Sequence, residues 1–440
     1  MLEKIQTILF GGSMVVLLLG TGIYLTIKLR FFPVRAMPFI LKNTVGTLLK
    51  KEDKNMHGGI SPFQAVTTAL AGTMGVGNIA GVATALVAGG PGAVFWMWIS
   101  AFLGMSTKYA EIFLAVKYRQ KSKTGRWFGG PMYYMEHGLG KKWVACIFAL
   151  LCALCSFGIG NMTQINAVSS SLWRTFGLSP LVTGVVIAAV ITLVIWGGVK
   201  RIAAVTEMVI PFISVVYIFC SGAFLWMHRD MLGETFLLIF RSAFSLKTAG
   251  GGVLGYSISQ ALRFGLSRGV FTNEAGLGSA PIAHAAAECK GPAHQGAWGV
   301  FEVFLDTIVV CTLTALVILT AQDGALWQSG LDGVMLTSAA FETAFGAFGG
   351  QFLAISILLF AVSGILGWYY YGESSLRYLA PSSKAAVPVY RTLYLFAIVA
   401  GAVSHLGAVW ALSDALNALM AIPNICAILY LRRVLWAESP

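Results

Sequence analysis

Apolar runs, each long enough to cross a bilayer, recur along almost the whole chain, and charged residues gather in the gaps between them. Every backbone polar group in hydrocarbon must be bonded internally, so such a chain folds as transmembrane helices. At roughly 20 residues a span, we predict an all-α polytopic membrane protein with about 11 transmembrane helices. The expected spans are residues 5–27, 62–88, 92–116, 143–176, 181–197, 203–227, a Gly-rich segment after 250, 297–319, 352–371, 387–409 and 412–431.

The composition supports this class and argues against soluble enzymes. Only 11% of the residues are charged, whereas soluble domains carry about 25%. The formal net charge of +12 does not indicate nucleic-acid binding, because the basic residues lie in short loops after alternate spans. Positive loops stay in the cytoplasm. We therefore predict a multi-pass protein of the cytoplasmic membrane, with the N-terminus outside and the C-terminus inside.

A glycine-rich stretch, residues 71–81, interrupts the second apolar run. Glycine and asparagine weaken helices, and irregular backbone at membrane depth is tolerated only where protein buries it or it lines a polar cavity. Gly75-x-Gly77-x-x-Ala80 fits a dinucleotide fingerprint, but no strand precedes it and the next acid is Glu111. A close helix-packing face at Gly77 and Gly81 is a second interpretation. A discontinuous helix at a transport site is the interpretation we favour.

A second glycine-rich segment, residues 250–252 and 267–281, forms the seventh expected span. Four spans follow each interrupted span, and the two interrupted spans run in opposite directions. This pattern is typical of inverted-repeat transporters. The expected organisation is an extra N-terminal span and basic loop at 1–61, a five-helix repeat at 62–227, an outer amphipathic segment at 228–250, an inverted five-helix repeat at 251–433, and a cytoplasmic tail at 434–440.

Four motifs resemble those of one transporter family. They are GGPGAVFWMWI at 89–99, GGPMYY at 129–134, TNEAGLGSAP at 272–281 and GWYYYGE at 367–373. They resemble the motifs of the alanine/glycine:cation symporters, also called sodium:alanine symporters. The resemblance implies a leucine-transporter-like fold of two inverted five-helix repeats, here with one extra N-terminal helix. It also implies sodium-coupled import of a small neutral amino acid, alanine and/or glycine.

A zwitterionic amino acid entering a dry site must exchange its hydration for protein contacts. Backbone N–H groups at a helix break suit its carboxylate. For Asn78 the alternative is a structural amide that satisfies the broken backbone, for Gln164 a plain interhelical hydrogen bond, and for Trp368 simple packing. The candidate substrate-binding residues are Thr73, Gly75, Gly77, Asn78, Gln164, Phe271, Thr272, Asn273, Gly364 and Trp368, with Glu274 expected to brace the second break from the inner side.

Sodium, as the co-transported ion, requires hard oxygen ligands. Matching the resembling fold onto this chain implies a sodium site formed by Ala71, Met74, Ala361, Ser363 and Gly364. The chain departs from the family where Ser363-Gly364 stands, because a Ser/Thr-Thr pair is usual there. Either another oxygen replaces the missing hydroxyl, or the cation site is weaker, or the substrate pocket is roomier.

Glu302 and Asp306 lie four residues apart on one face of the eighth span, where membrane carboxylates are costly and usually functional. A proton- or cation-linked role and a salt bridge to Lys108 or Arg263 both remain open. The alternatives to sodium symport are an intramembrane enzyme and a proton-coupled amino-acid transporter. We expect no enzymatic activity, because the carboxylates form no convincing catalytic dyad and no nucleophile–base motif is present.

Overall fold

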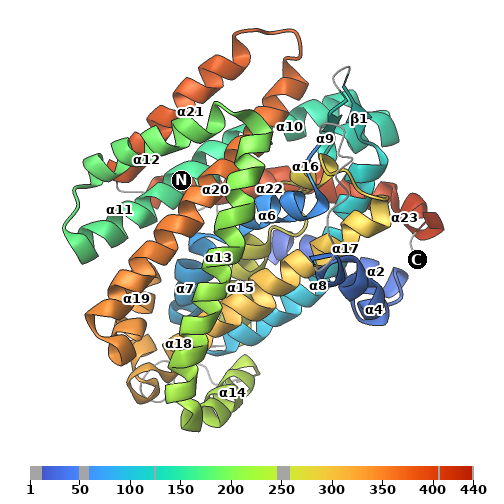
Figure 1. Ribbon diagram of the computed structural model, residues 1–440. Helices are drawn as coiled ribbons and strands as arrows, with labels where there is room; N and C mark the ends of the chain where they lie inside the picture. The colour runs from blue at the N-terminus through green and yellow to red at the C-terminus, as the bar shows by residue number, and fades with distance from the viewer. Residues whose placement is uncertain (1–11, 49–58, 123–124, 245–257, 405–406, 439–440) are drawn as a thin grey trace.

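The structure is a computed structural model that describes residues 12–48, 59–122, 125–244, 258–404 and 407–438. These residues are almost entirely helical, apart from a short antiparallel hairpin in which Gln120 pairs with Phe128. The start of the expected first span and the glycines at 250–252 lie outside the described residues. Figure 1 shows the hairpin at one end of the molecule and helix α14 at the other.

The first half of the described chain holds seventeen consecutive elements. They are α2 (Gly12–Lys28), α3 (Phe32–Arg35), α4 (Met37–Asn43), α5 (Val45–Leu48), α6 (Pro62–Thr73), η1 (Gly77–Gly81), α7 (Val82–Gly89), α8 (Gly92–Lys117), β1 (Gln120–Lys121), β2 (Trp127–Phe128), α9 (Pro131–Tyr133), η2 (Tyr134–Gly138), α10 (Lys142–Phe157), η3 (Gly158–Met162), α11 (Thr163–Phe176), α12 (Pro180–Ile195) and α13 (Gly198–Met227).

The named elements of the second half are all helices among its described residues. They are α14 (Arg229–Ala243), α15 (Ile258–Asn273), α16 (Pro281–Ala285), α17 (Pro292–Val303), η4 (Phe304–Cys311), α18 (Thr312–Thr320), η5 (Ala321–Gly324), η6 (Leu326–Gln328), α19 (Gly333–Phe345), α20 (Ala347–Leu379), α21 (Ala386–Val403), α22 (Gly407–Tyr430) and α23 (Arg432–Glu438).

Seven of the described helices are long and apolar enough to cross a membrane, and a broken helix pair makes an eighth span. The broken pair joins α6 to η1 and α7 with a bend of 51°. Shorter apolar helices cover 14–28 and 180–195, where the sequence predicts the first and fifth spans. The polytopic all-α class is thus confirmed, whereas the count of eleven stays a prediction.

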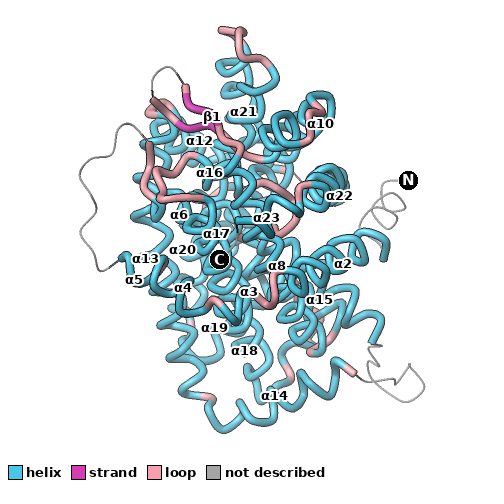
Figure 2. The backbone as a smooth tube through the Cα atoms, turned by 90° about the vertical axis from the view of Figure 1, so that its right-hand side faces the viewer, coloured by secondary structure: helices cyan, strands magenta, loops and turns pink. Residues whose placement is uncertain are grey.

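Helix α8 is the centre of one group of helices. It packs along α15 and α17 and also contacts α2, α14 and α16. A second set of contacts joins α10, α11, α12, α20 and α21. The broken span α6–α7 lies between them, because α6 contacts both α13 and α20 whereas α7 contacts α15 and α18. Figure 2 shows the same helices from the side.

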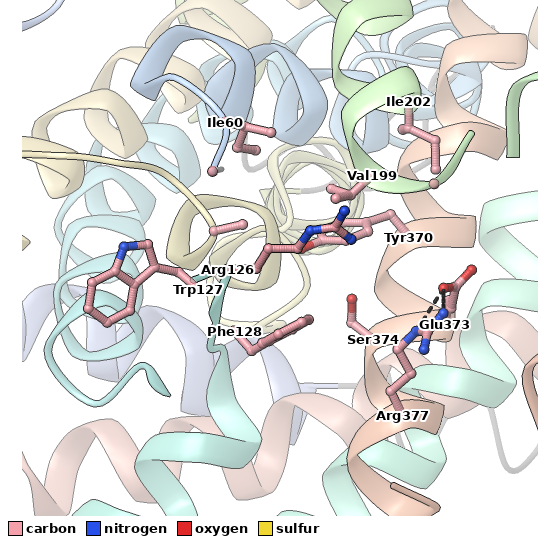
Figure 3. Close-up of a pocket in the computed structure, with 13 residues that line it drawn as sticks. Ile60, Arg126, Trp127, Phe128, Val199, Ile202, Tyr370, Glu373, Ser374 and Arg377 are labelled. Carbon is pink, nitrogen blue, oxygen red and sulfur yellow. Dashed lines mark hydrogen bonds and ion pairs between the residues drawn. The ribbon is translucent and has the colours of Figure 1, made fainter. Parts of the chain in front are cut away.

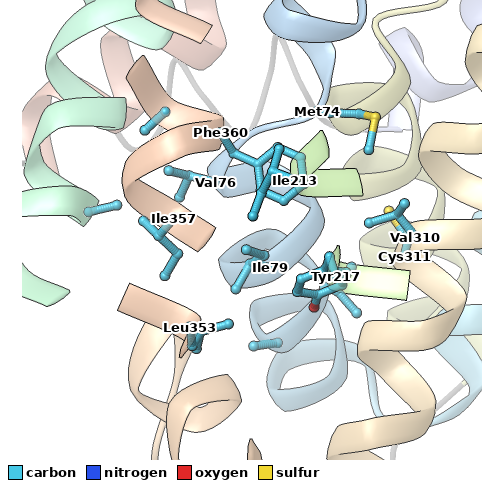
Figure 4. Packing of buried hydrophobic residues seen from close by; sticks show 14 of the residues in the cluster. Met74, Val76, Ile79, Ile213, Tyr217, Val310, Cys311, Leu353, Ile357 and Phe360 are labelled. Atoms are coloured by element: carbon cyan, nitrogen blue, oxygen red, sulfur yellow. The ribbon is translucent and has the colours of Figure 1, made fainter. Parts of the chain in front are cut away.

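An apolar cluster packs around the break in the first core span. Met74, Val76 and Ile79 are at most 3% exposed. They face residues of α13, η4 and α20, including Ile213 and Phe360 (Figure 4). Burial of such side chains is favourable by about 1.5–3 kcal/mol each, so this packing fixes the broken backbone on its apolar side and leaves its polar groups to the neighbouring helices.

Candidate substrate and ion site

The helix break in α6 frees backbone groups that a continuous helix would pair. An α-helical amide bonds to the carbonyl four residues earlier, and Met74 still does so, to Leu70 O at 2.6 Å. The next amide, Gly75 N, donates instead to Asn78 Oδ1 at 3.0 Å. Val76 N donates to Gln164 Oε1 at 3.3 Å. Two successive backbone amides at the break therefore bond to side chains. This agrees with the discontinuous helix predicted from the glycine-rich stretch.

Asn78 ties this break to the eighth expected span. Its side-chain nitrogen donates to Asp306 Oδ1 at 2.7 Å and to Asp306 O at 3.1 Å. Asp306 also accepts a 2.8 Å hydrogen bond from the Thr307 hydroxyl. All three residues are at most 2% exposed. In this structure Asn78 thus satisfies the broken backbone and a buried carboxylate together.

Wider π-helical turns lie beside all three of these polar groups. Asn78 belongs to η1, Asp306 belongs to η4, and Gln164 is the second residue of α11, which follows η3. Such turns inside α-helices frequently mark functional sites. A π turn changes the angle at which side chains leave the helix. The contact between Asp306 and Asn78 was therefore not predictable from α-helical spacing in the sequence.

Gln164 and Gly364 close one side of the break. A Cβ added at Gly75 would lie 2.9 Å from Gln164 Oε1, and one added at Gly364 would lie 3.4 Å from Gln164 Cδ and 3.3 Å from Ala71 O. The amide of Gln164 is therefore held between two glycines, with 6% of the residue exposed. The absence of side chains at both glycines leaves the space that Gln164 now fills.

The second break follows α15, which ends at Asn273. Glu274 has φ 53°, and Gly276 and Gly278 also have positive φ. Asn273 stabilises this turn by accepting from Ala275 N at 3.0 Å, and it donates to Thr307 at 3.3 Å. The sequence predicts an interruption within the glycine-rich stretch at 267–281, and the structure places the non-helical segment from 274 onward.

The two breaks face each other through small contacts. A Cβ at Gly77 would meet Thr272 Cγ2 at 2.8 Å and Phe271 Cδ1 at 3.8 Å. The Thr272 hydroxyl is used within its own helix, where it donates to the carbonyls of Arg268 and Gly269. Thr272 thus presents its methyl group, and not its hydroxyl, to the first break.

Trp368 on α20 connects both breaks directly. Its indole N–H lies 3.3 Å from Gly72 O and 3.1 Å from Glu274 Oε1. Gly72 O is one of the carbonyls that the break releases, so Trp368 caps it. Glu274 also accepts a short hydrogen bond from Ser279. The predicted bracing role of Glu274 therefore has a geometric basis, and Trp368 is a link between helices as well as a packed side chain.

The residues expected to hold sodium lie around the same break. Ala71 O, whose helical partner would be Gly75 N, faces Gly364. The Ser363 hydroxyl is fully buried and has no hydrogen-bond partner among the described residues. Within the part of the chain that the structure describes, the Ser363 hydroxyl thus lacks the hydrogen bond that buried oxygens normally make. Met74 and Ala361 are also fully buried, and Met74 N continues the helix while its side chain joins the apolar cluster.

A buried ion pair lies in the helix group centred on α8. Lys108 Nζ is 3.2 Å from Glu302 Oε1, and His284 Nε2 is 3.0 Å from Glu302 Oε2. Gln295 bonds to the other ring nitrogen of His284 at 2.8 Å. All four residues are fully buried. The sequence left open a salt bridge of these carboxylates to Lys108 or Arg263. In the structure Glu302 pairs with Lys108, whereas Asp306 accepts a hydrogen bond from Asn78.

Sequence reasoning missed Tyr371 and Asn424. A Cβ at Gly72 would lie 2.9 Å from the buried Tyr371 hydroxyl. Asn424 on α22 donates to Gly276 O at 2.9 Å and makes short hydrogen bonds with Glu111 and Tyr134. Asn424 lies far along the chain in an apolar run, and an amide there gives no positional signal about its partner.

Comparison with known proteins decides the family. The model of the sodium:alanine symporter family matches residues 1–439. This chain belongs to the sodium:alanine symporter family. The sodium/alanine symporter AgcS of Methanococcus maripaludis is 44% identical over 445 residues, covering 100% of this chain and 96% of AgcS. The probable sodium/glutamine symporter GlnT of Bacillus subtilis is 41% identical, covering 98% of this chain and 87% of GlnT.

The fold of this family member is shared with solved transporters. Mhp1, a nucleobase-cation-symport-1 family transporter, superposes with a TM-score of 0.51 at 13% identity, covering 86% of this chain and 94% of Mhp1. The expected leucine-transporter-like class is therefore confirmed. The chain is a multi-pass membrane transporter and not an enzyme, which rules out the intramembrane-enzyme alternative.

Proposed function

We propose that this chain imports alanine or glycine across the cytoplasmic membrane, driven by the sodium gradient. The observation that carries the proposal is the break in α6, where two amides and two carbonyls leave the helix at one buried place. AgcS, whose name states sodium/alanine symport, is 44% identical over the whole chain. We include glycine as a substrate because the space beside Gly75, Gly77 and Gly364 is limited.

In this proposal Gln164 occupies the position of the substrate carboxylate. Its Oε1 accepts from Val76 N as a carboxylate oxygen would. When the amino acid binds, Gln164 turns aside and its amide N–H₂ donates to the same carboxylate, so no backbone group is left unpaired. Asn78 stays bonded to Gly75 and Asp306 and keeps the break open. Thr73, Phe271, Thr272 and Asn273 form the surrounding wall.

Sodium is the second substrate, and its proposed ligands are Ala71 O and the Ser363 hydroxyl, with carbonyls of Met74 and Ala361 completing the shell. Because Gly364 offers no hydroxyl, a water or a carbonyl takes the remaining position. Binding of the ion would join α6 to α20, the same two helices that Trp368 already links. The ion and the amino acid thus stabilise one arrangement of the break, which is the basis of coupling.

We further propose that the basic hairpin lies in the cytoplasm and α14 outside. The two five-helix repeats at 62–227 and 251–433 would then surround the site as inverted units, with the remaining segments outside this core. Alternating access would be a relative movement of the helix group around α8 against the group that contains α20. Lipid contacts the exposed apolar faces, such as those of α12 and α21.

Uptake into proteoliposomes tests this function. Alanine should accumulate when sodium is higher outside than inside, and the accumulation should reverse direction when the gradient is reversed. Glycine should compete with alanine, whereas glutamine should compete poorly, because Cβ positions at Gly75, Gly77 and Gly364 already lie 2.9, 2.8 and 3.3 Å from neighbouring atoms. Accumulation driven by a proton gradient in the absence of sodium would favour the proton-coupled alternative, and no accumulation under either gradient would contradict the proposal.

A further inference from the structure

A cavity of about 160 Å³ opens between the two helix groups at the end of the molecule that carries the hairpin. It exceeds by far the ~10–15 Å³ that holds one water on this measure. One wall consists of Ile60, Ala286 and the hairpin residues that follow α8, and the opposite wall consists of the first turn of α13 and the last turns of α20 (Figure 3). The cavity therefore adjoins the inner ends of both broken spans.

The inner ends of the two broken spans are joined to each other beside this cavity. Ile60, just before α6, forms a parallel β-bridge with Ala287, just after α16. Glu288 N donates to Ile60 O at 2.9 Å, and the Glu288 carboxylate accepts from Gly59 N at 2.6 Å. An amino acid released between the helix groups would meet the cavity immediately beyond this seal.

Charged side chains give the cavity the chemistry of an amino-acid site. Arg126 extends into it from the hairpin (Figure 3), and its guanidinium makes no hydrogen bond or ion pair with any described residue. Across the cavity, Glu373 is paired with Arg377, whose nitrogens lie 2.8 and 2.7 Å from Glu373 Oε1. The cavity lining thus holds two guanidiniums and one carboxylate, and the positive charge that is not paired lies on Arg126.

We propose that this cavity is a release site that binds the transported amino acid by its carboxylate on Arg126 and its ammonium group on Glu373. A guanidinium binds a carboxylate through two parallel N–H donors. Both contacts of Arg377 use Oε1 of Glu373, and a carboxylate has about four acceptor positions, so an ammonium group can be added. The inference rests on the proposed transport function and on the orientation that places the hairpin in the cytoplasm.

The site is tested by measuring transport separately at each face. In inverted vesicles, which expose the hairpin side, Arg126→Gln should raise the KM for sodium-dependent alanine exchange about fivefold, which is a modest loss for a charged hydrogen bond. The KM in right-side-out vesicles should not change, which also shows that the variant is folded. Arg126→Lys should restore part of the lost affinity. The effect should diminish at high salt, because salt screens an exposed charge.

Lys121→Gln is the matched control, because it removes a positive charge from the same hairpin at an exposed position outside the cavity lining. An equal change in this control, or an unchanged KM in Arg126→Gln, would overturn the proposal. Propionate, which has the carboxylate but no ammonium group, should compete weakly at the hairpin side. Competition as strong as that of alanine would show a general anion site instead. Failure of the transport function itself would appear differently, as no sodium-dependent exchange by the unmodified protein at either face.

Discussion

Gln164 and Asn78 are two buried amides at the same helix break, and their hydrogen bonds differ. This difference predicts that Gln164 contacts the substrate and that Asn78 is structural. Gln164 accepts one 3.3 Å hydrogen bond from Val76 N. Asn78 accepts a hydrogen bond from Gly75 N and also donates one to Asp306. We predict that Gln164→Leu weakens alanine binding by about 1–3 kcal/mol, roughly five- to a hundredfold, with a small effect on unfolding. Asn78→Leu should mainly lower the thermal stability in detergent, since it strands a buried carboxylate.

These two variants are compared by titrating alanine binding and by following thermal unfolding of the same samples. Equal losses of stability in both variants, with alanine affinity unchanged in Gln164→Leu, would assign Gln164 to the structural role. The two variants are a matched pair, because each replaces a buried amide side chain of the same site by leucine.

Gly364 carries the second prediction at this scale. A threonine side chain there would meet Ala71 O and Gln164, which lie 3.3 and 3.4 Å from the position of its Cβ. We predict that Gly364→Thr shifts selectivity toward glycine and against alanine and serine, because a methylene-sized clash is worth about 1–3 kcal/mol. Competition assays at fixed sodium measure this shift.

A sodium titration at fixed alanine separates the two roles of Gly364. If the added hydroxyl completes the ion site, half-maximal transport should require less sodium while the substrate preference stays the same. A well-expressed variant that changes neither curve would show that Gly364 contacts neither site.

The sequence predicts which membrane-embedded residues have polar roles, because such side chains are unusual there. It does not predict which residues they contact. Asn78 and Gln164 are amides in apolar runs, so a polar role was predictable. That Asn78 would meet Asp306 was not, because the contact joins π turns on two helices that lie 228 residues apart. Asp306 itself was recognised as costly, but its surroundings depend on how η1 and η4 pack.

At the scale of helices, the close approach of α6 and α20 depends on glycine. A Cβ at Gly367 would lie 3.0 Å from Gly72 N and 3.1 Å from Thr68 O, and backbone atoms cannot move aside as side chains can. We predict that Gly367→Ala separates the two helices, reduces the rate of alanine transport and costs about 1–3 kcal/mol of stability through overpacking. Transport rates and unfolding temperatures measure both effects.

Gly222→Ala is the control for this prediction. Gly222 lies within α13, and a Cβ there would have no atom within 4 Å. Alanine should be tolerated or slightly stabilising at this position, because it favours helix more than glycine does. Equal behaviour of the two variants would show that α6 and α20 do not need to approach so closely.

Element boundaries followed from the sequence where helix-breaking residues cluster. The break of the first core span falls within 71–81, because Gly75 and Gly77 weaken the helix there. The sequence also predicts one long span at 143–176, and the structure has one at Lys142–Phe176. That η3 widens this helix was not predictable from the sequence, since a π turn has no composition that distinguishes it from an α-helical turn.

At the scale of the molecule, the ion pair of Lys108 and Glu302 holds together the helix group around α8. Both side chains are fully buried, so removing one partner leaves an uncompensated charge. We predict that Lys108→Met destabilises the protein by about 3–5 kcal/mol. The double variant Lys108→Met with Glu302→Gln should recover much of this loss, as measured by thermal unfolding. A double variant as unstable as the single one would show that the pair is not the source of the loss.

The arrangement of charge along the whole molecule carries the last prediction. The exposed Lys121 lies on the hairpin, and Asp230 lies on α14, with its side chain 92% exposed, at the opposite end of the molecule (Figure 1). Positively charged loops remain in the cytoplasm, so we predict that the hairpin end faces inward. In a background without the seven native cysteines, Asp230→Cys should react with a membrane-impermeant maleimide added to intact cells. Lys121→Cys should react only after the cells are permeabilised. The reverse pattern would invert the orientation and move the Arg126 cavity to the outer face. Reaction of both sites in intact cells would contradict the placement of the two ends on opposite sides of the membrane.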